Sequence, residues 1–305
     1  MTHQRTVRVL SLGAGVQSSA LLLMSLCGEL PRLDAAVFAD TQWEPAPVYE
    51  HLAWLESQAH AAGVPIFRVS TGNLRADALS FRRHRKSADG KRYASMPLFV
   101  LNRNGSQGIL RRQCTKEYKV LAVHRSIRRS ILRLEAGKRV PAGTIVEQWM
   151  GITWDERTRM KRPRVGWSVH VFPFCNLAVD RRGDGPSPNL LPRLWTRQSC
   201  VDWLTAHYPN RTIPRSACIG CPYRSNAEWR SMRDTDPDSW RDAIAFDARI
   251  REEEEAHLAK VTRVAGLPFV HREMKPLGDV DLSPQRDAEF WDGVAENECE
   301  GMCGV

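Results

Sequence analysis

Several cysteines of this chain stand in a pattern that could bind a metal or carry out redox chemistry. Cys218 and Cys221 form a Cys-x-x-Cys pair, Cys114 stands well before them, and Cys299 and Cys303 lie close to the last residue. Thiolates are soft ligands that suit Zn²⁺ and iron–sulfur clusters. We therefore expect metal binding, while a structural Zn²⁺ and a redox-active Cys-x-x-Cys pair stay open as alternatives. Of the remaining three of the eight cysteines, Cys27 is expected to lie in the core, on the apolar first helix, and Cys175 and Cys200 are expected to be structural.

A second candidate site is the glycine turn of Gly13, Ala14 and Gly15, which follows an apolar run and precedes an apolar helix. A strand, a glycine turn and a helix start form an anion site, because free N–H groups point outward and the helix dipole favours negative charge. Ser18 and Ser19 open the helix and add hydroxyl donors. The turn lacks the lysine of the common P-loop and the third glycine of the dinucleotide-binding motif. We predict a phosphate site here, with an ordinary strand–turn–helix as the simpler interpretation.

The elements that must position these residues alternate between strands and helices. Apolar runs predict buried strands from residue 7 and at 33–39, 64–69 and 144–152. A helix is expected from about Pro47. This alternation implies an α/β fold with a doubly wound, mostly parallel sheet. The carboxyl ends of such strands bind ligands, and three segments fall there: 13–18, 40–45 and 153–159.

Two stretches do not follow this alternation of strands and helices. Residues 71–113 are too long for a plain connection, and we interpret them as a mobile lid, a binding loop or a solvated charged loop, with basic runs at 81–86 and 91–92. Residues 160–192 contain several prolines and glycines, and we interpret them as a loop with short extended pieces.

The C-terminal part is expected to be helical. Thr196 should cap one helix, Ser225 or Asn226 a second, and Pro237 should open a third that reaches about Val261. We see no clear second core and predict a single α/β domain with a helical elaboration. The expected division is a nucleotide-binding unit, residues 1–215, and residues 216–305, which pack with it as one unit.

Composition limits the class of protein. The chain has 305 residues, and no apolar run reaches the length that spans a membrane, so we expect a cytoplasmic protein without a membrane partner. Its net charge of +9 fits either an arginine-biased proteome or a polyanionic partner, from a nucleotide to DNA or RNA. One helix face is basic, which is usually a solvated surface: Arg125, Arg128, Arg129 and Arg133.

Five segments in order resemble the phosphoadenosine phosphosulfate (PAPS) reductase-like branch of the PP-loop, or adenine nucleotide alpha-hydrolase, superfamily. The turn at 11–19 is similar to S-G-G-x-D-S, and 40–45 is similar to D-T-G-x-x-x-P-E-T. Residues 112–119 resemble C-x-x-x-x-K, and 151–159 resemble G-x-R-x-D-E-S-x-x-R. The fifth segment is the Cys-x-x-Cys pair, preceded by a Trp-Thr dipeptide like that of the family. The resemblance covers about residues 7–230.

The resemblance implies roles for individual residues. Lys119 and Arg159 would neutralise phosphate or sulfate oxygens. Asp155 and Glu156 would bind Mg²⁺ or orient a cation, with a plain surface acidic pair as the alternative. Gln17 stands where the family has an aspartate. The nucleotide itself would be held by Ser11, Gly13, Ala14, Gly15, Gln17, Ser18, Ser19, Phe38, Ala39, Asp40 and Gly151.

The resemblance also implies an iron–sulfur cluster. Related adenylylsulfate reductases hold a [4Fe–4S] cluster with two pairs of cysteines, and here Cys114, Cys218 and Cys221 would supply three ligands. A terminal cysteine, Cys303 or Cys299, would be the fourth ligand, or the fourth iron would be open. Cys299, in a tail similar to the Glu-Cys-Gly end of PAPS reductases, could instead attack a sulfonyl sulfur.

The expected activity is cleavage of ATP to AMP and pyrophosphate to activate an acceptor, followed by sulfur transfer, with nucleic acid as a candidate acceptor. DNA phosphorothioation sulfurtransferases belong to this branch. A sulfur donor or a reductant would be a further partner. One alternative is a sulfonucleotide reductase that acts on PAPS or adenylylsulfate. The other is a non-catalytic iron–sulfur sensor that binds nucleic acid, which the replacement at Gln17 would favour.

Overall fold

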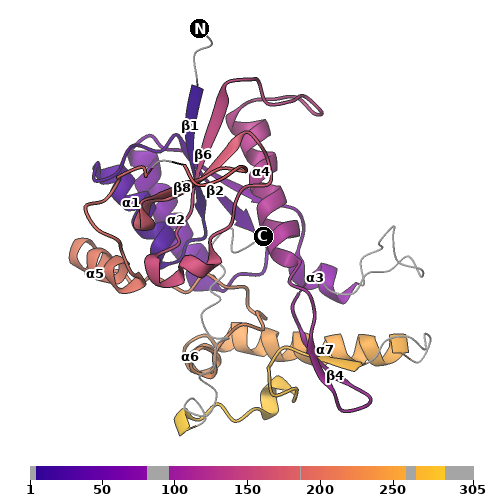
Figure 1. The fold of residues 1–305 in the computed structure, drawn as a ribbon. Coiled ribbons are helices and arrows are strands. Elements are labelled where there is room, and N and C mark those ends of the chain that lie inside the picture. The colour runs from indigo at the N-terminus through magenta and orange to yellow at the C-terminus, as the bar shows by residue number, and fades with distance from the viewer. Residues whose placement is uncertain (1–4, 81–95, 186, 259–265, 286–305) are drawn as a thin grey trace.

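The computed structural model describes residues 5–80, 96–185, 187–258 and 266–285 (Figure 1). The basic runs at 81–86 and 91–92 and the two terminal cysteines, Cys299 and Cys303, lie outside the described residues.

A six-stranded sheet forms the centre of the larger part of the molecule, in the order β3-β2-β1-β6-β7-β8. The first five strands in this order are parallel, and β8 is antiparallel to β7. The α/β class and the mostly parallel, Rossmann-like sheet are therefore confirmed. The strands are β1 (Arg5–Leu12), β2 (Ala35–Asp40), β3 (Ile66–Ser70), β6 (Thr144–Trp149), β7 (Ser168–Phe172) and β8 (Leu177–Val179).

Helices cover both faces of this sheet, which explains why its central strands β1 and β2 are largely apolar and buried. Leu10 and Leu12 of β1 pack with the helices of one face, whereas Val7 and Val9 pack toward the other. The first face is covered by α1 (Val16–Cys27), α2 (Ala46–Ala61) and α5 (Arg197–His207). The second is covered by a continuous helix made of η1 (Thr115–Val120), α4 (Leu121–Ser126) and η2 (Ile127–Ile131).

The segment 71–113 is more regular than the sequence suggested. It contains α3 (Leu74–Leu79) and a hairpin of β4 (Phe99–Asn102) and β5 (Gln107–Ile109). The hairpin joins β9 (Gly266–Phe269) in a three-stranded antiparallel sheet of order β5-β4-β9. The expectation of an irregular loop is wrong for these residues, because strands of three or four residues give a weak sequence signal and β9 is distant in the chain. A role of this segment as a lid or in binding stays a prediction.

The C-terminal part contains the expected helices, α6 (Asn226–Thr235) and α7 (Pro237–Leu258), but also this second sheet (Figure 1). A separate hydrophobic cluster holds it together, with Trp229 and Phe246 fully buried at its centre. The expectation that there is no second core is therefore wrong. The cluster combines α3, the start of β4 and α6–α7, so residues from both expected units of the chain build it.

The stretch 160–192 contains the short extended pieces that the sequence predicted, and they are strands of the main sheet. It contains β7, a strand paired on both sides, and β8 at the edge of the sheet. Short 3-10 turns, η3 (Trp154–Arg159) and η4 (Pro173–Cys175), connect these strands, and η5 (Leu277–Asp279) follows β9.

The predicted caps are confirmed. The Thr196 side chain accepts a hydrogen bond from the Ser199 N–H and completes a capping box, and Ser225 forms a second one with Glu228. The helix after the glycine turn begins at Val16, slightly earlier than expected, so Ser18 and Ser19 lie inside its first turn. Cys27, the last residue of this helix, is exposed, so the expectation that it lies in the core is wrong.

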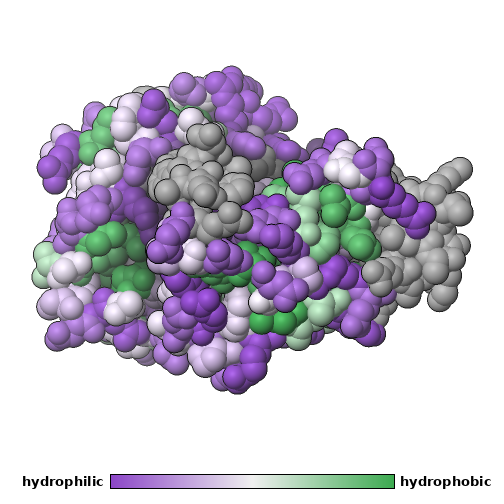
Figure 2. Space-filling view, turned by 90° about the horizontal axis from the view of Figure 1, so that it is seen from below, coloured by the Kyte–Doolittle hydropathy of each residue, from purple (hydrophilic) through white to green (hydrophobic). Residues whose placement is uncertain are grey.

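The surface seen from below is mostly hydrophilic, with separate apolar patches (Figure 2). The large apolar side chains that are exposed come from different elements: Leu101, Ile109, Leu121, Trp154 and Leu194. No helix within the described residues is long and apolar enough to cross a membrane.

Asp247 of α7 links this helix to the segments around Val270 and Leu277 in the second hydrophobic core. Its buried carboxylate accepts hydrogen bonds from the N–H groups of Val270 and Leu277, at 2.9 and 2.8 Å, and pairs with Arg251. We expect Asp247→Ala to lower the free energy of unfolding by about 3–5 kcal/mol, because it leaves a cation and two backbone donors without their partner. Urea unfolding would measure this.

Asp238→Ala is the matched control, since Asp238 lies on the same helix and pairs with Arg241 at the exposed surface. It should cost less than about 1 kcal/mol. Equal losses for the two variants would contradict the role assigned to Asp247.

Candidate functional site

The turn between β1 and α1 has the backbone of an anion site. Ala14 adopts a left-handed conformation, with φ 59°, and Gly15 is extended at the N-cap. The first backbone bond of the helix runs from the Ser19 N–H to the Gly15 carbonyl, so the preceding N–H groups have no acceptor within the helix. The Ser18 hydroxyl accepts from the Gly13 N–H at 3.2 Å and donates to the Gly15 carbonyl at 3.4 Å, which fixes the turn.

Gln17 joins this turn to two other segments. Its Nε2 donates to Glu156 Oε2 at 3.0 Å, and its Oε1 accepts from Arg197 Nη1 at 2.9 Å. Glu156 also pairs with Arg159, at 2.8 Å between Oε1 and Nη1. Gln17 is fully buried and Glu156 is nearly so. The structure therefore brings together three of the predicted site residues, Gln17, Glu156 and Arg159, through a shared buried carboxylate.

The carboxylate of Asp155, the residue before Glu156, has a different hydrogen-bond partner. Both of its carboxylate oxygens lie 3.2 Å from the backbone N–H of Arg197, the first residue of α5. A carboxylate at a helix N-terminus is stabilised by the helix dipole. Asp155 and Glu156 thus have protein partners here, and a role for either one in binding Mg²⁺ stays a prediction.

Two serines predicted to hold the nucleotide have their hydroxyls on internal partners. Ser11 Oγ accepts from Gln148 Nε2 at 3.0 Å, and Ser19 Oγ lies 2.9 Å from His51 Nε2. Burial lowers the pKa of His51 to about 4, with a smaller contribution from the charge of Arg211. Sequence reasoning missed His51 because nothing near it in the chain identifies α2 as the neighbour of Ser19.

The end of β2 lies beside the turn, as expected for adjacent parallel strands. Phe38, Ala39 and Asp40 are buried. The Asp40 carboxylate accepts from the Tyr49 hydroxyl at 2.8 Å and from the Gln42 N–H at 2.7 Å. Burial, and then this hydrogen bond, raise the pKa of the Tyr49 phenol. Asp40 thus shapes the loop after β2, and contact of this backbone with adenine stays a prediction.

The three described cysteines of the predicted cluster line one small pocket. Cys114, Cys218 and Cys221 surround it together with Lys119, Arg112 and Thr41. Lys119 and Cys218 are buried. Within the described residues, no group of three or more histidine, cysteine, aspartate or glutamate side chains is placed to hold a metal ion. The three cysteines therefore share one pocket, and their binding of a metal stays a prediction.

The Cys-x-x-Cys turn packs on the loop after β2. The Ile219 N–H donates to the Trp43 carbonyl at 2.9 Å, and a Cβ on Gly220 would lie 2.3 Å from the Trp43 ring, so only glycine fits between the two cysteines. Cys218 Sγ lies 3.2 Å from Thr41 Oγ1 and 3.4 Å from Glu44 Oε1. Trp43, Thr41 and Glu44 thereby position the first cysteine.

Arg224 contacts the Cys-x-x-Cys turn on the side opposite Trp43. Its guanidinium donates to the carbonyls of Ala217, Cys218 and Ile219, at 2.8, 3.1 and 3.3 Å. Burial and the neighbouring Arg215 lower the pKa of Arg224 to about 10. Sequence reasoning missed this residue, although an arginine that closely follows a Cys-x-x-Cys pair is a usable signal.

Ser216 connects the two halves of the site. Its hydroxyl donates to the carbonyl of Gly13, so the segment that leads into Cys218 is bonded to the glycine turn. Gly151, which follows β6, is buried at the same edge of the sheet. The glycine turn, the end of β2 and the cysteine pocket are therefore neighbours.

The chain matches no family model, no curated protein and no solved structure. Functional interpretation therefore depends on the residues and contacts of this site.

The buried His51 predicts a pH dependence of stability. The folded pKa of about 4 lies below the ordinary value near 6.5, so its contribution is present above pH 6.5 and is lost as pH falls toward 4. We expect His51→Gln to reduce the stability lost between pH 7 and pH 5 by roughly 1–2 kcal/mol. Urea unfolding at both pH values would measure this.

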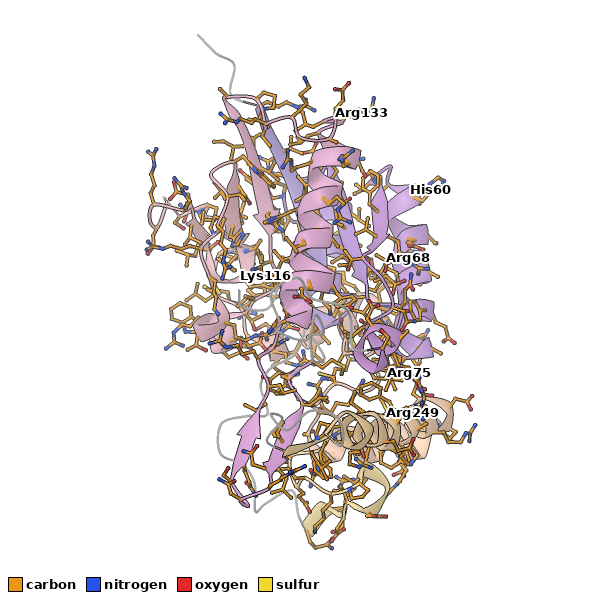
Figure 3. All side chains as sticks on the ribbon, turned by 90° about the vertical axis from the view of Figure 1, so that its right-hand side faces the viewer. His60, Arg68, Arg75, Lys116, Arg133 and Arg249 are labelled. Atoms are coloured by element: carbon orange, nitrogen blue, oxygen red, sulfur yellow. The ribbon has the colours of Figure 1, made fainter. Side chains whose placement is uncertain are left out.

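His60→Gln is the matched control, because His60 is exposed near the other end of the same helix (Figure 3). This variant should keep the wild-type pH dependence. An unchanged dependence in His51→Gln would show that protonation of His51 does not oppose folding.

Proposed function

We propose that this chain is an adenine-nucleotide-binding enzyme with a cysteine-bound iron–sulfur cluster, of the PP-loop type and related to PAPS reductases. It cleaves ATP to AMP and pyrophosphate to activate an acceptor. This activation prepares the transfer of sulfur to nucleic acid. One observation carries this proposal. Three cysteines and Lys119 line one pocket, and the segment leading into that pocket is bonded through Ser216 to the glycine turn.

The turn is suited to hold phosphates. The N–H groups at the start of α1 have no acceptor within the helix, and the dipole of this helix adds positive charge. Lys119 and Arg159 would neutralise the charge that develops on the leaving pyrophosphate. Glu156 and Gln17 hold Arg159 at this edge, so the guanidinium is oriented before a nucleotide arrives.

The donor atoms of this pocket are of the kind that an iron–sulfur cluster takes. Three soft sulfur ligands come from Cys114, Cys218 and Cys221, and a fourth would come from Cys303, outside the described residues. Arg112 and Lys119 line the same pocket, and their positive charge suits a cluster whose thiolates give it net negative charge. When bound, such a cluster supplies a site for electrons or for sulfide.

A second candidate function is a sensor that binds the nucleotide or nucleic acid without turnover. Gln17 favours it, because an amide that is buried between Glu156 and Arg197 cannot act as the carboxylate that stands at this position in the family motif. A sulfonucleotide reductase, the remaining alternative, would depend on Cys299, which lies outside the described residues.

Gly15→Asp tests the nucleotide site. A carboxylate at the N-cap of α1 would repel phosphate from the turn, so we expect ATP affinity to fall by at least roughly tenfold and formation of AMP and pyrophosphate to be lost. Anaerobic incubation with ATP·Mg²⁺, and separately with PAPS and adenylylsulfate, would measure binding and products.

Gly166→Asp is the control, because Gly166 is exposed and a Cβ there meets no atom within 4 Å. Wild-type ATP affinity in Gly15→Asp would exclude the turn as the phosphate site. Sulfite released from a sulfonucleotide would instead establish the reductase, and binding without products would establish the sensor.

Cys218→Ser tests the cluster. We expect anaerobically purified wild type to be brown and to contain iron and acid-labile sulfide, and Cys218→Ser and Cys114→Ser to lose most of both, because each removes a ligand. Cys27→Ser, an exposed cysteine of α1, should keep the wild-type content. Zinc without sulfide in the wild type would indicate the structural metal site, and iron that survives in both ligand variants would contradict the assignment.

A further inference from the structure

A cavity of about 510 Å³ lies between α2, α6 and the segment that joins α5 to the Cys-x-x-Cys pair. In Figure 1, α2 belongs to the upper part of the molecule and α6 to the lower part, so the cavity lies where these two parts meet. Sites for small molecules commonly have volumes of about 300–1,000 Å³. The cavity is therefore large enough for a small organic ligand.

Most of the charged side chains that line this cavity already have partners in the protein. Arg215 pairs with Glu228, and the buried Arg224 donates to carbonyls of the Cys-x-x-Cys turn. Asp236 accepts a hydrogen bond from the Ser239 N–H at 3.1 Å, at the start of α7. These four charged groups are thus fixed parts of the wall. Two further charged side chains of the lining face a different situation.

Arg211 is the first of these two side chains. Its guanidinium carbon lies 4.6 Å from the centre of the Trp54 ring, and its Nη2 donates to the Glu50 carbonyl at 3.4 Å. These contacts orient the guanidinium, yet no carboxylate pairs with it in the part of the chain that the structure describes. Pro45 and Pro47, at the N-terminus of α2, line the same cavity, and the dipole of this helix adds positive charge. A carboxylate of a ligand would fit beside Arg211.

Glu50 is the second of these side chains. It lies on α2, is exposed, and forms no ion pair among the described residues. Its backbone carbonyl accepts the hydrogen bond from Arg211, so the carboxylate and the guanidinium belong to one region of the wall. The two side chains do not pair with each other, and each can therefore take an opposite charge from a ligand. The natural partner of the Glu50 carboxylate is an ammonium group.

The apolar part of the lining limits the ligand further. It consists of Pro45, Pro47, Val48, Pro214 and Met232. A fitting ligand has a carboxylate for Arg211, an ammonium group for Glu50 and a body that can lie against apolar side chains. A free α-amino acid has all three properties. An inorganic anion would leave Glu50 without a partner, and a metal cation would be repelled by Arg211.

We propose that this cavity binds a free α-amino acid, with its carboxylate on Arg211 and its ammonium group beside Glu50. Two other residues of the lining place the ligand next to the candidate functional site. His51 contacts Ser19 of α1, and Arg224 donates to the Cys-x-x-Cys turn. The binding does not depend on the proposed cleavage of ATP, and it can be measured without a nucleotide.

Calorimetric titration of the full chain with each of the twenty common L-amino acids, in the absence of ATP, tests the site. We expect at least one of them to bind with a Kd below about 1 mM. The same compound without its amino group, and its carboxamide, should each bind at least roughly tenfold more weakly, because each lacks one of the two charges. Binding of none of the twenty would overturn the proposal, and so would equal affinity for the amino acid and the two analogues.

Arg211→Gln tests the carboxylate end of the ligand. We expect affinity for the amino acid to fall at least roughly tenfold, because the variant removes the cation that meets the carboxylate. Arg103→Gln is the matched control, with the same change at an exposed arginine between β4 and β5. It should keep the wild-type affinity. Equal losses in the two variants would overturn the assignment of Arg211.

Glu50→Gln tests the ammonium end. Arg211 packs on Trp54, so its replacement can disturb folding, whereas Glu50 is exposed. We expect Glu50→Gln to lose the preference for the amino acid over the analogue without an amino group. Glu135→Gln, at another exposed glutamate, should keep this preference. A wild-type preference in Glu50→Gln would overturn the assignment of the ammonium site.

Two further results separate the amino-acid site from the proposed function. Amino-acid binding that persists in Gly15→Asp would support the site even where no ATP is bound or cleaved. Cleavage of ATP by a wild-type protein that binds no amino acid would overturn the site and leave the proposed function standing.

Discussion

The structure depends on a buried carboxylate that must be paired. Glu156 lies at the carboxyl edge of the main sheet, where an unpaired charge would be costly to bury, and Gln17 and Arg159 satisfy it from two different segments. Arg197 extends the network to α5. The first turn of α1, the 3-10 turn after β6 and the start of α5 are thereby fixed relative to one another. Any ligand at the glycine turn would meet an edge whose polar groups are already in place.

The second hydrophobic core also constrains the position of the Cys-x-x-Cys pair. The Cys-x-x-Cys turn is held between Trp43 on one side and the guanidinium of Arg224 on the other. Trp43 belongs to the loop after β2, yet it packs with Phe246 of α7, and its indole N–H donates to Asp242. The position of Cys218 is therefore set by both parts of the molecule, and not by the local turn alone.

Much of the main sheet could be predicted from the sequence, because its central strands are largely apolar and α5, which packs on it, has a local cap at Thr196. The proximity of the strand ends was also predictable from the sequence, since the carboxyl ends of parallel strands lie at one edge of a sheet. The hairpin of β4 and β5 could not be predicted from the sequence, because its stability depends on β9, a partner distant in the chain. The partners of Ser11, Ser19 and Gln17 were beyond prediction for the same reason, since each lies on another element and no local pattern encodes it.

The pairing of β4 with β9 has a consequence for synthesis of the chain. The ribosome releases β4 and β5 early, but the strand that completes their sheet follows only after α6 and α7. During translation the hairpin therefore waits with one edge unpaired, while the parallel sheet of the first part can already close around β1. Cys114 emerges just after this hairpin, and Cys218 and Cys221 emerge much later. The cysteine pocket therefore cannot form until the chain has passed Cys221, well after the strands β1 to β3 can pair with one another.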